Sequence, residues 1–387
     1  MLYFDHNATT FLAPEVADTL AEALREVYGN PSSIHRQGQF ARQELEKARR
    51  VIANFIGGSP QEFVFTSGGT ESNNLAISGL LRGLPPGPKH VVTTTVEHPA
   101  VLEPLRQWQR VDVTCVDVDR QGIVNPEVIA RALRDETVLV SVMHANNETG
   151  SMQPIRSVAN IVEARRAGGQ TIFLHSDGVQ ALGKIPVDVR ELGVDLYSVS
   201  GHKVFAPKGI GGLFVRKVVP LQPIHFGGRH ERSRRAGTEN VPAAVAFARA
   251  VSLCDAAAKE NLAALRDAFE FGLQERSVDF EINGARNCRL PNTSNLLLRG
   301  VSAEALVIAL DMKGIAVSTG SACSSGSVEP SHVLLAMGRS REEARSSVRF
   351  SLGRYNTPED VNALVEAVAS ATARLRSSSK RERPLLV

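Results

Sequence analysis

Apolar stretches of strand length, rich in β-branched residues, alternate with helical patterns along the first half of the chain. The strand-like runs are 62–66, 90–95, 111–116, 137–143, 171–174 and 195–200. Strands that are apolar along their whole length and separated by helices indicate a mostly parallel sheet with helices on both faces. Because such sheets bind ligands at the carboxyl ends of their strands, the residues that follow these runs are candidates for a binding site.

Two helices are predicted before the first of these strands. Residues 14–27 form a helical pattern that has Pro14 in its first turn and Gly29 just beyond its end. Residues 39–56 form a second helical pattern, which stops at Gly57. Proline at the start and glycine after the end are the usual boundary signals of a helix.

A second alternation of strand-like and helical runs follows the long helical pattern that begins near Pro242. Its runs are 293–298, 303–313 and 348–352. This repeat of the alternation predicts a smaller carboxy-terminal domain. We place the large domain at residues 15–255 and the small domain at residues 1–14 and 256–387.

Composition is that of a soluble globular protein, with 43% hydrophobic and 22% charged residues. The 387 residues exceed the size at which a single hydrophobic core stops growing, which agrees with two domains. The net charge of +3 is too small to favour nucleic acid as a partner.

Membrane, secretion and metal signals are missing from the sequence. No apolar run approaches the roughly 18 residues of a membrane-spanning helix, and the first residues lack a basic stretch followed by an apolar one. We therefore expect a cytoplasmic protein that does not enter a membrane. The cysteines form no Cys-x-x-Cys pair, so neither a metal site nor a disulfide framework is indicated. They are Cys115, Cys254, Cys288 and Cys323.

The most informative lysine is Lys203, in the stretch Ser200-Gly-His-Lys203 that follows the strand-like run 195–200. A lysine that is desolvated at a strand end can lose its proton and form a Schiff base with a carbonyl. The alternative is a solvated loop lysine, which is the commoner case.

A phosphate site is indicated by Thr66-Ser-Gly-Gly-Thr70, between a strand and the helical run 71–81. The free amides of a helix start attract an anion, Gly69 allows close approach, and Thr70 adds a hydroxyl. The alternative is a tight turn with a threonine N-cap. Ser200 and His202, from another strand end, offer further donors.

An acid ends the strand-like run 171–174, in the stretch His175-Ser-Asp177. Asp177 can pair with a protonated pyridine nitrogen, which keeps such a ring able to accept electrons. Gln180 can then donate to a phenolic oxygen of the ring. The alternative for Asp177 is a helix N-cap.

Two more strand ends carry polar side chains. His98, just before Pro99, can stack on a flat ring or act as an acid or base, and the alternative is a helix-capping histidine. Asn147, in Ala145-Asn-Asn-Glu-Thr-Gly150, can bind a substrate carboxylate. The alternative there is a simple turn.

The remaining candidates lie in loops and in the second domain. Cys323 sits among glycine, serine and alanine, which suits a mobile nucleophile, whereas we expect Cys115 to be a buried small hydrophobe. Arg349 can hold a carboxylate with its planar fork, or form a partly buried ion pair. In the basic loop 227–238, Thr238 can contact phosphate, and the alternative is a solvated face.

Together these motifs resemble the NifS/IscS group of cysteine desulfurases, which are pyridoxal-phosphate enzymes of the class V aminotransferase family. The resemblance runs from Tyr3 to about Val368. The matching stretches are Asp5-His-Asn-Ala-Thr-Thr10, Gly29-Asn-Pro-Ser-Ser33, Phe65-Thr-Ser-Gly-Gly-Thr-Glu-Ser72, Glu97-His-Pro-Ala-Val-Leu102, Ala145-Asn-Asn-Glu-Thr-Gly150, Ser200-Gly-His-Lys203, Arg234-Arg-Ala-Gly-Thr-Glu-Asn240 and Gly320-Ser-Ala-Cys-Ser-Ser-Gly-Ser327.

The resemblance implies an α/β fold of type I, with a mostly parallel seven-stranded sheet in a large domain and a smaller α+β carboxy-terminal domain. It also implies pyridoxal 5'-phosphate as cofactor. Lys203 would form the Schiff base with it, Asp177 would pair with its pyridine nitrogen, Gln180 would contact its phenolic oxygen, and His98 would stack on its ring. The residues implied to bind its phosphate are Gly69, Thr70, Ser200 and His202.

The implied reaction converts L-cysteine to L-alanine. Asn147 and Arg349 would hold the substrate carboxylate, and Cys323 would attack the substrate sulfur and keep it as a persulfide, with His98 as a proton carrier. The sulfur would pass to a protein acceptor such as an iron–sulfur scaffold. Thr238 would reach the phosphate of the other subunit, which implies a homodimer.

Other activities share parts of this pattern. A selenocysteine lyase or an aminotransferase of the same family is one alternative, and Cys323 is the residue that separates them from a desulfurase. A non-enzymatic sulfur-relay or assembly protein is the more distant alternative. The acceptor is left open among nitrogenase assembly, general iron–sulfur assembly and tRNA thiolation.

Overall fold

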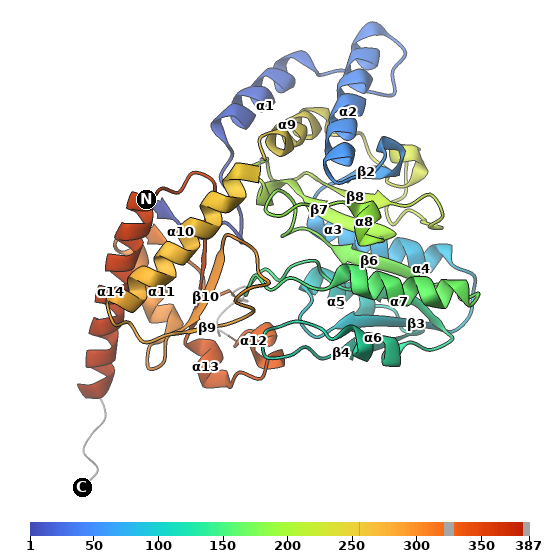
Figure 1. Ribbon diagram of the computed structural model, residues 1–387. Coiled ribbons are helices and arrows are strands. Elements are labelled where there is room, and N and C mark those ends of the chain that lie inside the picture. The colour runs from blue at the N-terminus through green and yellow to red at the C-terminus, as the bar shows by residue number, and fades with distance from the viewer. Residues whose placement is uncertain (255, 321–328, 382–387) are drawn as a thin grey trace.

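A seven-stranded sheet forms the middle of the protein, whose computed structural model describes residues 1–254, 256–320 and 329–381 (Figure 1). β8 runs antiparallel to β2 and β7, and the other neighbouring pairs are parallel. This is the mostly parallel sheet that the sequence predicts. In spatial order the strands are β2 (Phe63–Thr66), β8 (Gly211–Val215), β7 (Leu196–Ser200), β6 (Phe173–Asp177), β5 (Thr137–Ser141), β3 (Lys89–Thr94) and β4 (Val111–Val116).

All six predicted strands are present, but the sequence analysis missed β8. That strand begins with two glycines, which lack the β-branched signal of a strand. Gly212 is needed because the ring of Phe63 fills the space beside it, so that a Cβ there would lie 2.0 Å from the ring carbon Cζ. A glycine in a strand therefore marks a close approach of a neighbouring side chain.

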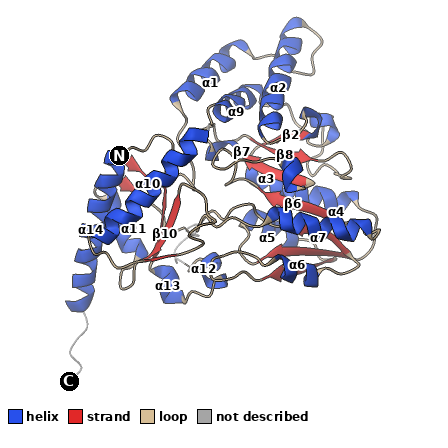
Figure 2. Cartoon of the chain, viewed as in Figure 1, coloured by secondary structure: helices blue, strands red, loops and turns tan. Residues whose placement is uncertain are grey.

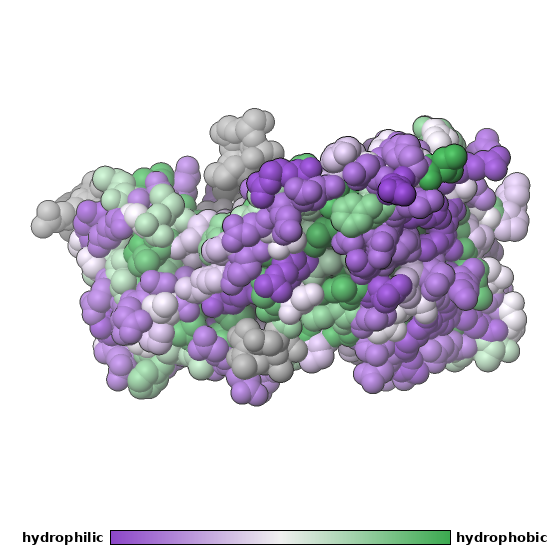
Figure 3. Space-filling model, turned by 90° about the horizontal axis from the view of Figure 1, so that it is seen from above, coloured by the Kyte–Doolittle hydropathy of each residue, from purple (hydrophilic) through white to green (hydrophobic). Residues whose placement is uncertain are grey.

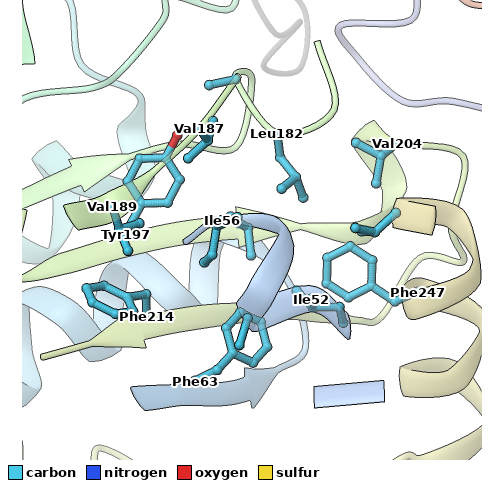
Figure 4. Packing of buried hydrophobic residues seen from close by; sticks show 14 of the residues in the cluster. Ile52, Ile56, Phe63, Leu182, Val187, Val189, Tyr197, Val204, Phe214 and Phe247 are labelled. Atoms are coloured by element: carbon cyan, nitrogen blue, oxygen red, sulfur yellow. The ribbon is translucent and has the colours of Figure 1, made fainter. Parts of the chain in front are cut away.

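Helices cover both faces of the sheet (Figure 2). Along β2, Phe63 and Phe65 face one layer and Val64 faces the other. Figure 4 shows the first layer, in which Ile52 and Phe247 lie near the ring of Phe63. The helices of the first layer are α1 (Pro14–Glu26), α2 (Arg36–Phe55), α6 (Pro126–Ala132), α7 (Ile155–Ala167), α8 (Val189–Leu192) and α9 (Val241–Ser252). The second layer contains α3 (Gly69–Asn74), a π-helical turn (Leu75–Gly79), α4 (Leu80–Gly83) and α5 (Pro99–Arg106).

The expectation that Cys115 is buried is wrong. Its strand, β4, pairs only with β3 and is the edge of the sheet. Val111 and Val113 pack against the second helix layer, whereas the side chain of Cys115 is exposed. An edge strand is covered less completely than a central one, and the apolar run 111–116 gave no sign of that position.

A second hydrophobic core lies among the carboxy-terminal elements and includes Phe4 from the start of the chain. Its strands are β10 (Thr293–Leu297), flanked by antiparallel β12 (Ser347–Ser351) and β9 (Glu281–Ile282), and the parallel pair β1 (Leu2–Tyr3) and β11 (Ile315–Ala316). Its helices are α10 (Ala256–Glu275), α11 (Ala303–Asp311) and α14 (Pro358–Arg381). The short helices α12 (His332–Ala336) and α13 (Arg341–Arg345) pack in a separate small cluster with Val96 and Met143. The domain boundaries given above stay a prediction. In the described part of the chain, no helix is long and apolar enough to cross a membrane.

The amino-terminal segment 5–10 connects this second core with the sheet. The amide of His6 donates to the carbonyl of Ser351 at 3.2 Å, and the amide of Thr10 donates to the carbonyl of His202 at 2.9 Å. We call residues 5–10 the strap. It crosses the carboxyl ends of the central strands, where ligands bind in sheets of this kind.

The position after Asp177 has no room for a side chain. A Cβ on Gly178 would lie 2.0 Å from the ring carbon Cζ of Tyr197. Tyr197 is fully buried, and its hydroxyl lies 2.8 Å from Nδ1 of His144, so its ring is held in place. Gly178 therefore lets the end of β6 pack tightly against β7.

We expect Gly178→Ala to lower the free energy of unfolding by about 1–3 kcal/mol, the usual effect of overpacking a core. Urea denaturation followed by circular dichroism measures it. The matched control is the same substitution in a Tyr197→Leu background, where the ring is gone and the loss should be smaller. An equal loss in both backgrounds would contradict this account of Gly178.

Candidate functional site

A cavity of about 640 Å³ opens at the carboxyl edge of the sheet, beside the strap. This volume suits a small cofactor with its substrate. Ten of the predicted site residues line the cavity: Gly69, Thr70, His98, Asn147, Asp177, Gln180, Ser200, His202, Lys203 and Arg349.

Of the remaining two predicted site residues, only Thr238 is described, and it does not line this cavity. Thr238 is exposed on the loop that follows the 3-10 turn Glu231–Ser233. Cys323 lies outside the described residues. The described neighbours of that segment, Gly320 and Glu329, both line the cavity.

Lys203 ends a 3-10 turn (Gly201–Lys203) directly after β7. Its Nζ donates to the carbonyls of Asn7 and Ala8, each at 2.6 Å. Burial and then the positive charge of Arg349 lower the pKa of Lys203 to about 8, against the opposing effect of the nearby carboxylates of Asp5 and Asp177. The alternative of a solvated loop lysine is therefore wrong, and the amine is suited to nucleophilic and proton-transfer chemistry.

Asp177 lies at the end of β6 and is buried. Its Oδ2 accepts from Nδ2 of Asn73 at 2.7 Å, and its Oδ1 accepts from the amide of Val179 at 3.0 Å. Residues 179–184 form turns, so the alternative of a helix N-cap is wrong. In the described part of the chain the carboxylate has no cationic partner. A buried carboxylate of this kind favours a cationic ligand group.

The glycine turn before α3 matches an anion cradle. Gly68 is the cap residue, with φ at 151°, so the alternative of a threonine N-cap is wrong. A Cβ on Gly69 would lie 2.7 Å from Val179. The first amides of a helix have no partner within it and carry partial positive charge. Oγ of Ser200 is buried and has no hydrogen-bond partner among the described residues, as expected for a group that binds a ligand.

His98 is both a helix cap and part of the cavity wall. It is the N-cap of α5, and its Nδ1 accepts from the amide of Ala100 at 3.0 Å, so the capping alternative is confirmed. Its proton is therefore on Nε2 when the ring is neutral. Burial lowers the pKa of His98, and the charges of Lys203 and His332 lower it further.

His202 faces the same cavity from the other side of the lysine. Its Nδ1 lies 3.1 Å from Oγ1 of Thr9 in the strap. Burial and then the charge of Lys203 lower the pKa of His202 to about 4. The ring is neutral at neutral pH, and it can still donate one hydrogen bond to an anion.

Arg349, on β12, brings a second cation to the cavity. Its Nη2 donates to Oδ1 of Asp5 at 2.6 Å, and its Nη1 donates to the carbonyl of Asn147 at 3.0 Å. Its Nε is buried and has no partner in the part of the chain that the structure describes. The ion-pair alternative is thus confirmed, and the residue still lines the cavity.

Asn147 lies in a turn closed by Oδ1 of Asn146, so the turn alternative is confirmed as well.

Five residues that shape the site were not singled out from the sequence. They are Asn7, Asn73, Glu148, Lys184 and His332. Four of them do not follow a predicted strand directly, so the strand-end criterion passed over them. Glu148 does follow the run 137–143, but only the side-chain amides of that stretch were considered as ligands. Within the described residues, no three side chains of His, Cys, Asp or Glu gather at one point where they could hold a metal ion.

The sequence matches a protein-family model over most of the chain. Residues 2–364 match the model described as Aminotransferase class-V. The chain belongs to the class-V aminotransferase family. The resemblance noted from the motifs is thereby confirmed at the family level.

Relatives of this class-V chain carry one recurring name. This chain is 44% identical, over 98% of its length, to a protein named cysteine desulfurase IscS from Dictyoglomus turgidum, and it covers 96% of that protein. It is 42% identical over 98% of its length to one of the same name from Methanosarcina thermophila, and covers 93% of it.

Solved structures show the same architecture. A structure titled NifS-like protein superposes with a TM-score of 0.90 at 35% identity, over 96% of this chain and 99% of that one. A second, titled SspA in complex with cysteine, superposes with a TM-score of 0.80 at 33% identity, over 92% of this chain and 100% of that one. The expected fold of type I is confirmed.

The charge environment of Lys203 gives a testable result. We expect its amine, in protein freed of pyridoxal phosphate, to titrate near pH 8, as measured by ¹³C NMR after reductive ¹³C-methylation. Arg349→Met should raise this pKa because it removes a neighbouring positive charge. In the folded protein the pKa lies below its ordinary 10.5, so the contribution of Lys203 to the free energy of unfolding rises with pH between about 8 and 10.5.

The same sample unfolded in urea is the control and should return the ordinary lysine value. A titration of the folded protein that coincides with the unfolded one would contradict the desolvated environment described for Lys203.

Proposed function

We infer that this protein is a cysteine desulfurase, which removes sulfur from L-cysteine and leaves L-alanine. Relatives with that name match it along nearly the whole chain. The observation that carries the inference is the cavity itself, which joins the amine of Lys203, the carboxylate of Asp177 and the guanidinium of Arg349 in one space.

The described residues fit pyridoxal 5'-phosphate as cofactor. The buried and unpartnered Ser200 hydroxyl, beside the glycine cradle, suits a phosphate. Asp177 lacks a cationic partner among the described residues and suits a protonated ring nitrogen. Gly69, Thr70 and His202 would complete the phosphate site.

The remaining contacts would be made along the ring. Lys203 would hold the carbonyl carbon, Gln180 would contact the phenolic oxygen, and His98 would stack on one face. When bound, this cofactor supplies an electron sink for bond breaking beside the substrate amine.

Substrate would be held at the far end of the cavity. Arg349 and Asn147 lie together there, joined by the 3.0 Å hydrogen bond to the Asn147 carbonyl. A carboxylate can take the place of water at the guanidinium, because Asp5 occupies only part of its five donors. This orients the amino acid with its amine toward Lys203.

Proton transfer would fall to Lys203 and His98. With a pKa of about 8, the Lys203 amine has a substantial neutral fraction at neutral pH and can take a proton from the substrate α-carbon. His98 presents an N–H at Nε2, because its Nδ1 is occupied by the helix cap. It can therefore carry a proton to the product carbon.

Sulfur transfer would be carried out by Cys323, whose role follows from the resemblance. Its thiolate forms a bond to the substrate sulfur while the carbon–sulfur bond breaks. The electron pair of that bond stays on carbon, which takes up a proton and becomes the methyl group of alanine. The sulfur is left as a persulfide, which a protein acceptor such as an iron–sulfur scaffold would then receive in the cytoplasm.

A homodimer is part of the proposal. The face over α1 and α2, seen from above in Figure 3, has apolar patches among hydrophilic ones. Tyr28 is 69% exposed and Ile34 is 90% exposed there, which is unusual for side chains of this size.

The loop that carries Thr238 is held beside the phosphate cradle of its own subunit, because Arg235 of that loop donates to Oε1 of Glu71 at 2.9 Å. Thr238 would reach the phosphate in the second subunit.

We expect Cys323→Ala to abolish alanine formation from L-cysteine while the protein still binds pyridoxal phosphate. Amino-acid analysis measures alanine, and absorbance measures the bound cofactor. The matched controls are Cys115→Ala and Cys288→Ala, both exposed thiols away from the cavity, which should keep full activity. Alanine formation at the wild-type rate in Cys323→Ala would favour a different reaction of the family.

The dimer proposal has its own test. Sedimentation equilibrium should give twice the chain mass of 41.7 kDa. Thr238→Val should keep that mass but weaken pyridoxal-phosphate binding about tenfold, because one hydrogen bond to a charged group is lost. A monomeric mass, or unchanged affinity in Thr238→Val, would overturn the contribution of this loop.

A further inference from the structure

A second buried lysine lies behind the cavity wall. Lys184 follows Gln180 in the turns after β6, and only 6% of its surface is exposed. Its Nζ donates to Oε1 of Gln180 at 2.6 Å and to Oδ1 of Asn7 at 2.9 Å. Lysine is rarely buried unless its amine is paired, so these two contacts need an explanation.

These contacts fix the side-chain amide of Gln180 in one orientation. Nε2 of Gln180 donates to the backbone carbonyl of Asn7 at 3.0 Å. A lysine amine is a donor here and a backbone carbonyl only accepts, so the oxygen of the amide must face Lys184 and its nitrogen must face Asn7. One N–H of that nitrogen is then left over, and Gln180 lines the cavity.

The partner residue Asn7 is itself held on all sides. Its Nδ2 donates to Oγ1 of Thr293 at 2.9 Å, and its Oδ1 also accepts from Nδ2 of Asn292 at 3.1 Å. The same backbone carbonyl of Asn7 accepts from Lys203. Asn7 therefore cannot turn to replace the donor that Lys184 provides.

The charge state of Lys184 does not alter this geometry. Burial, and then the charges of Lys203 and Arg349, lower the pKa of Lys184 far below its ordinary value. A neutral amine still has two N–H groups, which is the number that the two acceptors require.

We propose that Lys184 is a positioning residue, which holds the Gln180 amide with its free N–H directed to the phenolic oxygen of bound pyridoxal phosphate. The proposal rests on the proposed function, because it assigns Lys184 a role toward that cofactor. Without Lys184 the buried amide oxygen loses its donor, and only the hydrogen bond from Nε2 to the Asn7 carbonyl still holds the amide in this orientation.

The test uses the holoenzyme of Lys184→Met, which keeps the bulk of the chain and removes the amine. The absorbance spectrum of bound pyridoxal phosphate is titrated from neutral to alkaline pH. A donor on the phenolic oxygen favours the deprotonated cofactor, in which that oxygen no longer shares a proton with the neighbouring nitrogen. Loss of the donor should therefore move the spectral midpoint up by about one pH unit, the size of one hydrogen bond.

The variants Gln180→Ala and the double variant Lys184→Met/Gln180→Ala complete a cycle. If Lys184 acts through Gln180, the double variant shifts no more than Gln180→Ala alone. Lys217→Met, at an exposed lysine, is the control and should leave the midpoint unchanged. Should Lys184→Met fail to fold, Lys184→Gln replaces it, since its shorter side chain cannot reach both acceptors and should give a smaller upward shift.

Three results would overturn the proposal. The first is an unchanged midpoint in both Lys184 variants while Gln180→Ala shifts, which would make Lys184 merely structural. The second is additive shifts in the double variant. The third is an unchanged midpoint in Gln180→Ala itself. Wild-type protein that binds no pyridoxal phosphate would instead refute the proposed function, and the two failures are thereby told apart.

Discussion

The burial of basic side chains at one edge of the sheet is the constraint on which the rest of the site depends. Lys184, Lys203 and Arg349 lie close enough that the charges of Lys203 and Arg349 act on Lys184, and that of Arg349 acts on Lys203. Only Asp5 pairs with one of them as an ion pair among the described residues. Like charges out of water are costly unless oxygen atoms surround them. The strap supplies those oxygens, through the carbonyls of Asn7 and Ala8 and the side chains of Asp5 and Asn7.

The strap also explains how two hydrophobic cores make one site. Phe4 is fixed in the carboxy-terminal core, and three residues later Asn7 receives hydrogen bonds from side chains of the sheet edge. Thr293 and Arg349, from β10 and β12, bind the same short segment. A displacement of the carboxy-terminal elements would therefore move the groups that hold Lys203. Arg349 and Lys203 are thus mechanically connected through the six residues of the strap.

Sequence patterns predicted the central sheet and the residues that end its strands, because long apolar runs leave few other folds. Asp177 and Lys203 were found in this way. Asn7 was not singled out as a site residue, since its role is made by contacts to residues 140 to 286 positions away, which no local pattern encodes. Gly212 and Cys115 show the same limit for the fold. Gly212 occupies its strand position because the ring of Phe63 leaves no room for a side chain there. Cys115 is exposed because its strand forms the edge of the sheet.

The histidines around the cavity differ from the lysines and the arginine in what they contribute. Burial lowers the pKa of His144, His175 and His202 to about 4, and lowers that of His98 as well. At neutral pH their rings are uncharged, so the positive charge of the cavity is carried by lysine and arginine. Each ring then offers one donor and one acceptor in a direction set by its hydrogen bonds. The cavity therefore combines the cationic groups of Arg349 and Lys203 with uncharged donors at the glycine cradle, and these two sets of groups differ in how they attract and orient an anion.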